Sequence, residues 1–126
     1  MVRVGVSICI LLAAGCASQS ANMQVGTSQS YLSIGEQREA LRAVRVEAAL
    51  PQGVKVLGSV DAQRCHRNSN DIEPTDDLVT IDLRVAAFAR GADGIAQVKT
   101  EKQSGLIKNC WYVLTAVATM FADPAK

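Results

Sequence analysis

The chain has 126 residues, of which 48% are hydrophobic, and this length suits one small domain. Its 13 basic and 12 acidic residues nearly cancel, and Arg3 lies in the N-terminal segment, so the rest of the chain is formally neutral. This balance argues against nucleic acid as a partner, because nucleic-acid binding needs a strong basic excess.

The first fifteen residues are typical of a bacterial export signal. Arg3 supplies one positive charge, and an uncharged run rich in Val, Ile, Leu and Ala follows over residues 4–14. This run is too short to span a bilayer, which takes about 20 residues, but it suits a signal peptide. The segment Ala13-Ala14-Gly15-Cys16 resembles the lipobox of bacterial lipoproteins. We predict a signal peptide over residues 1–15 and lipidation of Cys16; the alternative is an ordinary signal peptide with a chance cysteine.

The segment after Cys16 sets the expected location of the protein. Two or three acyl chains hold a protein on a membrane far more firmly than one. In lipoproteins of this type an aspartate at the position of Ala17 favours the inner membrane, so Ala17 predicts the outer membrane. Residues 17–35 carry no charge and no regular period, which predicts a flexible tether over residues 16–35. Fully extended, it would reach about 60 Å, with the domain facing the periplasm.

The folded domain is predicted over residues 36–126, and its beginning can be interpreted in two ways. Val44 and Val46 alternate with charged residues, as in a half-buried strand. The residues from Glu36 onward are good helix formers, so a longer helix is the alternative. We predict a short helical turn followed by a strand.

A second strand, a loop and a helix are expected next. Valines alternate with polar residues over 54–64, where Gly58 indicates a bulge. Residues 66–75 are polar and predict a loop, and Thr75 or Asp76 can cap a helix that stops at Gly91. The predicted apolar stripe of this helix is Leu78, Ile81, Val85, Phe88 and Ala92, with Asp82, Arg84 and Arg90 projecting elsewhere.

Two further strands complete the domain. One is predicted over residues 95–100, and a long one over 109–121. Both faces of the last strand are largely apolar, so it is expected in the centre of the sheet. The fold class is therefore α+β, a small four-stranded sheet with one packed helix in the order β-β-α-β-β.

The cysteines have separate predicted uses. Cys9 is removed with the signal peptide and Cys16 is lipidated, which leaves Cys65 and Cys110 as a pair in an oxidising compartment. A disulfide between them is the main prediction. A zinc or copper site that includes His66 is an alternative, although adjacent residues on an extended chain point to opposite sides. A catalytic thiol is the third possibility, and no cofactor is predicted.

Three local motifs resemble those of RcsF-like outer-membrane lipoproteins, the envelope stress sensors of the Rcs system. They are Leu57-Gly58-Ser59-Val60 followed by Cys65, the turn Arg90-Gly91-Ala92-Asp93-Gly94-Ile95, and Cys110-Trp111. The resemblance implies that Cys65 and Cys110 match one of that family's two disulfides; the second pair is absent here. The first two motifs also recur in YbjQ-type domains, which lack lipidation and the disulfide.

The expected function follows from this resemblance. It implies an envelope stress sensor that signals through periplasmic protein contacts, with an inner-membrane phosphorelay regulator and outer-membrane proteins as partners. The alternative is a structural or ligand-binding lipoprotein without a signalling role. No enzyme is expected, since the chain shows no paired carboxylates at useful spacing, no nucleophile elbow and no phosphate loop.

Overall fold

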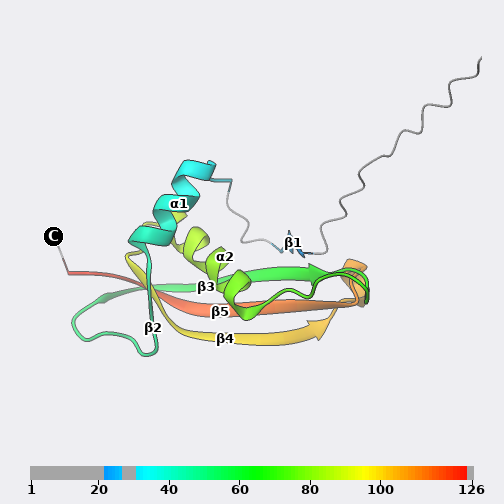
Figure 1. Cartoon of the computed structure of the whole chain (residues 1–126). Helices are drawn as coiled ribbons and strands as arrows, with labels where there is room; N and C mark the ends of the chain where they lie inside the picture. The colour runs from blue at the N-terminus through cyan, green and yellow to red at the C-terminus, as the bar shows by residue number, and fades with distance from the viewer. Residues whose placement is uncertain (1–21, 27–30, 125–126) are drawn as a thin grey trace, which may run out of the picture.

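The computed structural model describes residues 22–26 and 31–124 (Figure 1). The predicted signal peptide, Cys16 and part of the predicted tether lie outside the described residues. The elements in chain order are β1 (Asn22–Val25), α1 (Ile34–Ala43), β2 (Arg45–Glu47), β3 (Lys55–His66), α2 (Asp76–Ala89), β4 (Gly94–Ser104), the short 3₁₀ turn η1 (Leu106–Lys108) and β5 (Tyr112–Ala122).

The strands form one mixed sheet in the order β1-β3-β5-β4-β2. Strand β2 pairs with β4 in parallel, and the other neighbours are antiparallel. Helix α2 packs on β3, β4 and β5, and α1 packs on α2, so both helices lie on the same side of the sheet (Figure 1). The predicted α+β class is confirmed. The predicted count of four strands and one helix is wrong, because β1 and α1 add a strand and a helix.

The central position predicted for the last strand is confirmed, and alternation along β5 explains it. One set of its side chains faces α2 and joins the main core. That core combines small alanines with larger residues from α2 and β3, and it includes Val60, Leu83, Leu114, Ala116 and Ala118. The alanines allow the helix to approach the sheet closely, and strands on both sides of β5 protect its backbone.

Helix α2 begins and ends as predicted, and Val85 and Ala92 of the predicted stripe are buried, but the buried surface differs from that stripe at other positions. The Thr75 hydroxyl accepts a hydrogen bond from the Leu78 N–H, and Gly91 has a positive φ of 78°. Ile81, predicted to be buried, is 38% exposed, whereas Asp82, predicted to project elsewhere, is buried. The sheet covers one flank of the helix and α1 another, so the buried surface is wider than a single stripe.

The segment predicted as a flexible tether contains β1 and the beginning of α1. Residues Asn22–Val25 form β1, which pairs with the end of β3 from His66 back to Gln63. Ser33 caps α1 through a capping box with Glu36, so the helix begins at Ile34, before the predicted domain boundary at residue 36. Helix α1 has ten residues rather than one turn, and β2 follows it as predicted. The four uncharged residues of β1 are too few to show an alternating pattern, so the sequence does not predict this strand.

The bounds of the middle strands differ from those predicted. The register of β3 against β5 shifts between Val56 and Gly58, which confirms the bulge at Gly58. Strand β4 runs to Ser104 instead of Thr100 and carries a second, unpredicted irregularity between Ala96 and Lys99. Strand β5 begins at Tyr112, later than residue 109, because the preceding residues form a tight turn.

Candidate functional site

The predicted disulfide between Cys65 and Cys110 is present, and it joins β3 to the turn that precedes β5. The two Cα atoms lie 5.6 Å apart, and the bond closes a separation of 45 residues. Both cysteines are buried beside Val113, with Val25 of β1 packed against them. The disulfide therefore ties together the end of β3, the β4–β5 connection and the N-terminal strand.

His66 points away from this disulfide. Its imidazole ring lies 4.8 Å from the ring of Tyr112, its cross-strand partner on β5. The side chain is buried, and Nδ1 has no hydrogen-bond partner within the described part of the chain. Because both sulfur atoms form the disulfide, Cys65, His66 and Cys110 do not assemble the metal site considered from the sequence. Within residues 22–26 and 31–124, no three His, Cys, Asp or Glu side chains are grouped to hold a metal ion.

A polar cluster covers the same end of the sheet. The Tyr112 hydroxyl donates a hydrogen bond of 3.0 Å to Glu73, and the Lys102 ammonium lies 3.4 Å from the same carboxylate oxygen. The hydroxyl and, secondarily, the ammonium lower the pKa of Glu73. Burial and the bond to Glu73 raise the pKa of Tyr112. This cluster holds the loop after β3 against the sheet.

A second polar group lies under α2. The Arg64 guanidinium binds the Asp82 carboxylate with two hydrogen bonds of 2.5 and 2.7 Å, and the Gln24 amide donates to the same carboxylate. Asp82 is 7% exposed and Arg64 16%. The sequence did not predict the Arg64–Asp82 ion pair or the contact of Gln24 with it. The sequence offered one signal for this site: Asp82 stands among the apolar residues of the helix. Asp82 was predicted to project away from the apolar stripe.

Exposed apolar side chains gather in the loops at the disulfide end. Leu106 and Ile107 belong to η1, Trp111 precedes β5, and Ile72 lies in the loop after β3. These residues stand outside the core, in contrast to the buried valines and alanines of the strands. Of these residues, only Trp111 belongs to a motif singled out in the sequence, the Cys110-Trp111 pair.

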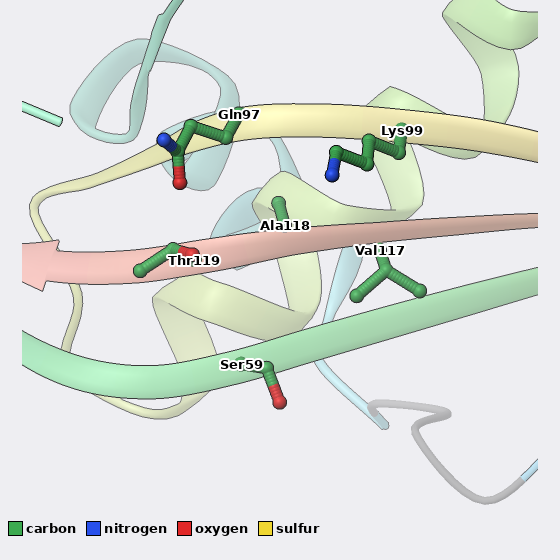
Figure 2. Close-up of a pocket in the computed structure, with 6 residues that line it drawn as sticks. All are labelled: Ser59, Gln97, Lys99, Val117, Ala118 and Thr119. Atoms are coloured by element: carbon green, nitrogen blue, oxygen red, sulfur yellow. The ribbon is translucent and has the colours of Figure 1, made fainter. Parts of the chain in front are cut away.

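The helix-free face of the sheet carries a shallow hollow beside the irregularity in β4. It is lined by Ser59, Gln97, Lys99, Val117, Ala118 and Thr119, from three adjacent strands (Figure 2). Gln97 has a φ of 57°, a left-handed conformation that a non-glycine residue adopts at a cost of about 1–3 kcal/mol. The hollow measures about 150 Å³, below the roughly 300 Å³ of small drug-sized pockets. Its geometry suits a surface contact rather than an enclosed ligand.

Comparison with known proteins adds no family to this description: no protein-family model matches the chain, and no curated protein matches it significantly. Among the helices of the described residues, none combines the length and the apolar character of a membrane span.

Proposed function

We propose that this chain is a lipoprotein of the bacterial envelope, exported by its signal peptide and anchored in the outer membrane through acylated Cys16. The observation that carries the proposal is the Cys65–Cys110 disulfide, because such bonds persist in oxidising compartments such as the periplasm. The apolar run over residues 4–14 and the small residues before Cys16 support the export and acylation steps.

Mass spectrometry of the protein isolated from bacterial membranes tests the anchor. We expect the chain to begin at Cys16 with acyl chains attached, and to fractionate with the outer membrane. Cys16→Ser abolishes acylation and releases the chain from that fraction, whereas Cys9→Ser, in the removed segment, changes neither. An unacylated chain that still carries residues 1–15 would contradict the proposal.

For its role, we propose envelope stress sensing through protein contacts, as the resemblance to RcsF-like lipoproteins implies. The helix-free face supports this choice, because it offers a bulge with a strained, exposed Gln97 beside exposed Lys99 and Ser59. Bulges re-aim side chains and strained residues cluster at functional sites. An inner-membrane phosphorelay regulator is the proposed partner.

A photo-crosslinking residue at Gln97 tests this contact in cells. We expect it to capture an inner-membrane regulator, and the same residue at Arg38, exposed on α1, to capture none. Deleting the gene is expected to abolish induction of an envelope-stress reporter. Capture of an outer-membrane protein or a second copy alone, together with unchanged induction under envelope damage, would contradict signalling and support the structural alternative.

A further inference from the structure

The connection between β4 and β5 presents large apolar side chains to solvent. Leu106 is 87% exposed, Ile107 101% and Trp111 69%. We call these three residues the β4–β5 tip. Single exposed apolar residues are ordinary on protein surfaces. Three within one short connection indicate a contact surface for a membrane or another protein.

The main chain holds this tip in one conformation. The N–H groups of Lys108 and Cys110 both donate to the Gly105 carbonyl, at 3.0 and 2.9 Å. A Cβ atom on Gly105 would lie 2.3 Å from the Cys110 carbonyl oxygen, so the turn closes tightly at that point. The disulfide then fixes Cys110 to β3. The apolar side chains therefore project from a turn that main-chain hydrogen bonds and the disulfide hold in place.

The N-terminal segment enters the fold at the same end of the sheet. Strand β1 is antiparallel to β3, and Asn22 pairs with His66, the last residue of β3 (Figure 1). The main-chain N–H of Trp111 also donates to the His66 carbonyl, at 2.7 Å. Cys16 precedes Asn22 by six residues in the sequence, a span of at most about 22 Å of extended chain. An acyl anchor on Cys16 is therefore kept near the tip.

We infer that the β4–β5 tip docks on the surface of the bilayer that holds the acyl chains. Leu106 and Ile107 enter the headgroup region, and Trp111 lies at the interface, where tryptophan is favoured. Arg67, directly after β3, and Lys108, whose ammonium donates to the Gln63 side-chain oxygen, are both exposed and suit contact with lipid phosphates. The inference rests on the proposed acylation of Cys16, and it sets the orientation of the domain: the disulfide end faces the membrane, and the opposite end points away from it.

Trp111 is the single tryptophan of the chain, so its fluorescence reports on the tip alone. The test uses the acylated protein, purified from bacterial membranes and reconstituted in vesicles of phosphatidylethanolamine and phosphatidylglycerol, with or without brominated acyl chains. We expect a blue-shifted emission and at least about a twofold loss of intensity in the brominated vesicles. The double variant Leu106→Ser/Ile107→Ser should lose most of this quenching and still float with the vesicles through its acyl chains.

The double variant Val46→Ser/Val56→Ser is the matched control. Both valines are about half exposed and lie at the opposite end of the sheet, beside Ile95 and Phe121, so quenching of Trp111 should be unchanged. Acylated protein that floats with the vesicles but shows no quenching would overturn the docking inference and leave the anchor intact. If mass spectrometry finds no acyl chain and the protein does not float, the proposed anchor fails and the inference fails with it.

Discussion

Asp82 is the residue at which three elements meet. Its carboxylate lies on α2, its main partner Arg64 on β3, and Gln24 on β1. Burying a charge is costly unless it is paired and hydrogen-bonded, and here the guanidinium contacts both carboxylate oxygens. The same carboxylate therefore anchors the helix to the sheet and holds the N-terminal strand in place.

Removing Asp82 should be one of the most damaging substitutions in the chain. Asp82→Ala removes the carboxylate that pairs with the largely buried Arg64 guanidinium, which is expected to lower the free energy of unfolding by about 3–5 kcal/mol. Denaturant unfolding followed by circular dichroism measures the change. The double variant Arg64→Met/Asp82→Leu should recover most of the loss, since an apolar pair leaves no buried charge.

The exposed pair between Glu39 and Arg42 on α1 is the matched control. These side chains are well exposed and 4.0 Å apart, so Glu39→Gln should change stability little. An effect of Asp82→Ala no larger than that of Glu39→Gln would show that the buried pair contributes no more than a surface contact.

Glu73 illustrates how a neighbour sets the titration of an exposed acid. Tyr112→Phe removes the hydrogen bond that lowers the Glu73 pKa most, so that pKa should rise toward its ordinary value of 4.5. Because the folded-state pKa is lowered, the stabilisation is present above pH 4.5 and is lost as the pH falls through the folded-state pKa. A carboxyl titration by NMR measures the shift, and unfolding at several pH values measures its effect.

Tyr31→Phe controls for the loss of a tyrosine hydroxyl. Tyr31 is 95% exposed, so this variant should leave the Glu73 titration unchanged. In Glu73→Gln, the stability difference from the unmodified protein should shrink as the pH falls from 4.5 through the folded-state pKa, because Glu73 becomes protonated first in the unfolded chain and then in the folded one. A difference that stays constant with pH would contradict the role given to the Glu73 charge.

At the scale of elements, β1 differs most from its prediction. It is a four-residue edge strand, and such a short strand is stable only through its contacts. Gln24 contacts Asp82 on the helix side of the sheet, while Val25 packs against the Cys65–Cys110 cluster. Because of these contacts, part of the predicted tether becomes the edge strand β1.

Val25→Asp tests whether those contacts hold β1. A carboxylate beside the buried disulfide should detach the strand, so the protection of β1 amides from hydrogen exchange should fall by more than about tenfold, about 1.4 kcal/mol. Amides in the ladder between β3 and β5 should keep their protection. Val46→Asp, on β2 at the opposite edge, should leave β1 protected. Unprotected β1 amides in the unmodified protein would contradict the assignment of this strand.

At the scale of the whole molecule, the disulfide compensates for a small core. The chain-entropy model gives a bond across 45 residues about 4 kcal/mol of stabilisation, a large share of the total stability of a small domain. We expect dithiothreitol to shift denaturant unfolding of the purified protein to a markedly lower midpoint. The double variant Cys65→Ala/Cys110→Ala should unfold at that lower midpoint with or without reductant. An unchanged midpoint after reduction would show that the core alone carries the fold.

Local patterns predicted a large part of this fold. The alternation in β3 and β5, the Thr75 cap and the stop at Gly91 depend on residues close in sequence, and each appears as predicted. The disulfide was predicted on the expectation that Cys9 is removed and Cys16 acylated, and the structure shows the Cys65–Cys110 bond. The buried face of α2 was not, because Asp82 becomes a buried residue only when Arg64, eighteen positions earlier, lies beneath it.

The sequence by itself determined the α+β class and the central place of β5, since periodicity is a local property. It also predicted the pairing of Cys65 with Cys110, on the expectation that the other two cysteines have other uses. Only the tertiary structure decided that residues 22–25 join the sheet and that Leu106, Ile107 and Trp111 stand at the end where the N-terminal segment enters. The physical reason is that both depend on partners distant in sequence. Val25 packs against a disulfide formed by residues 65 and 110, and the tip is placed by the antiparallel register of β1 on β3.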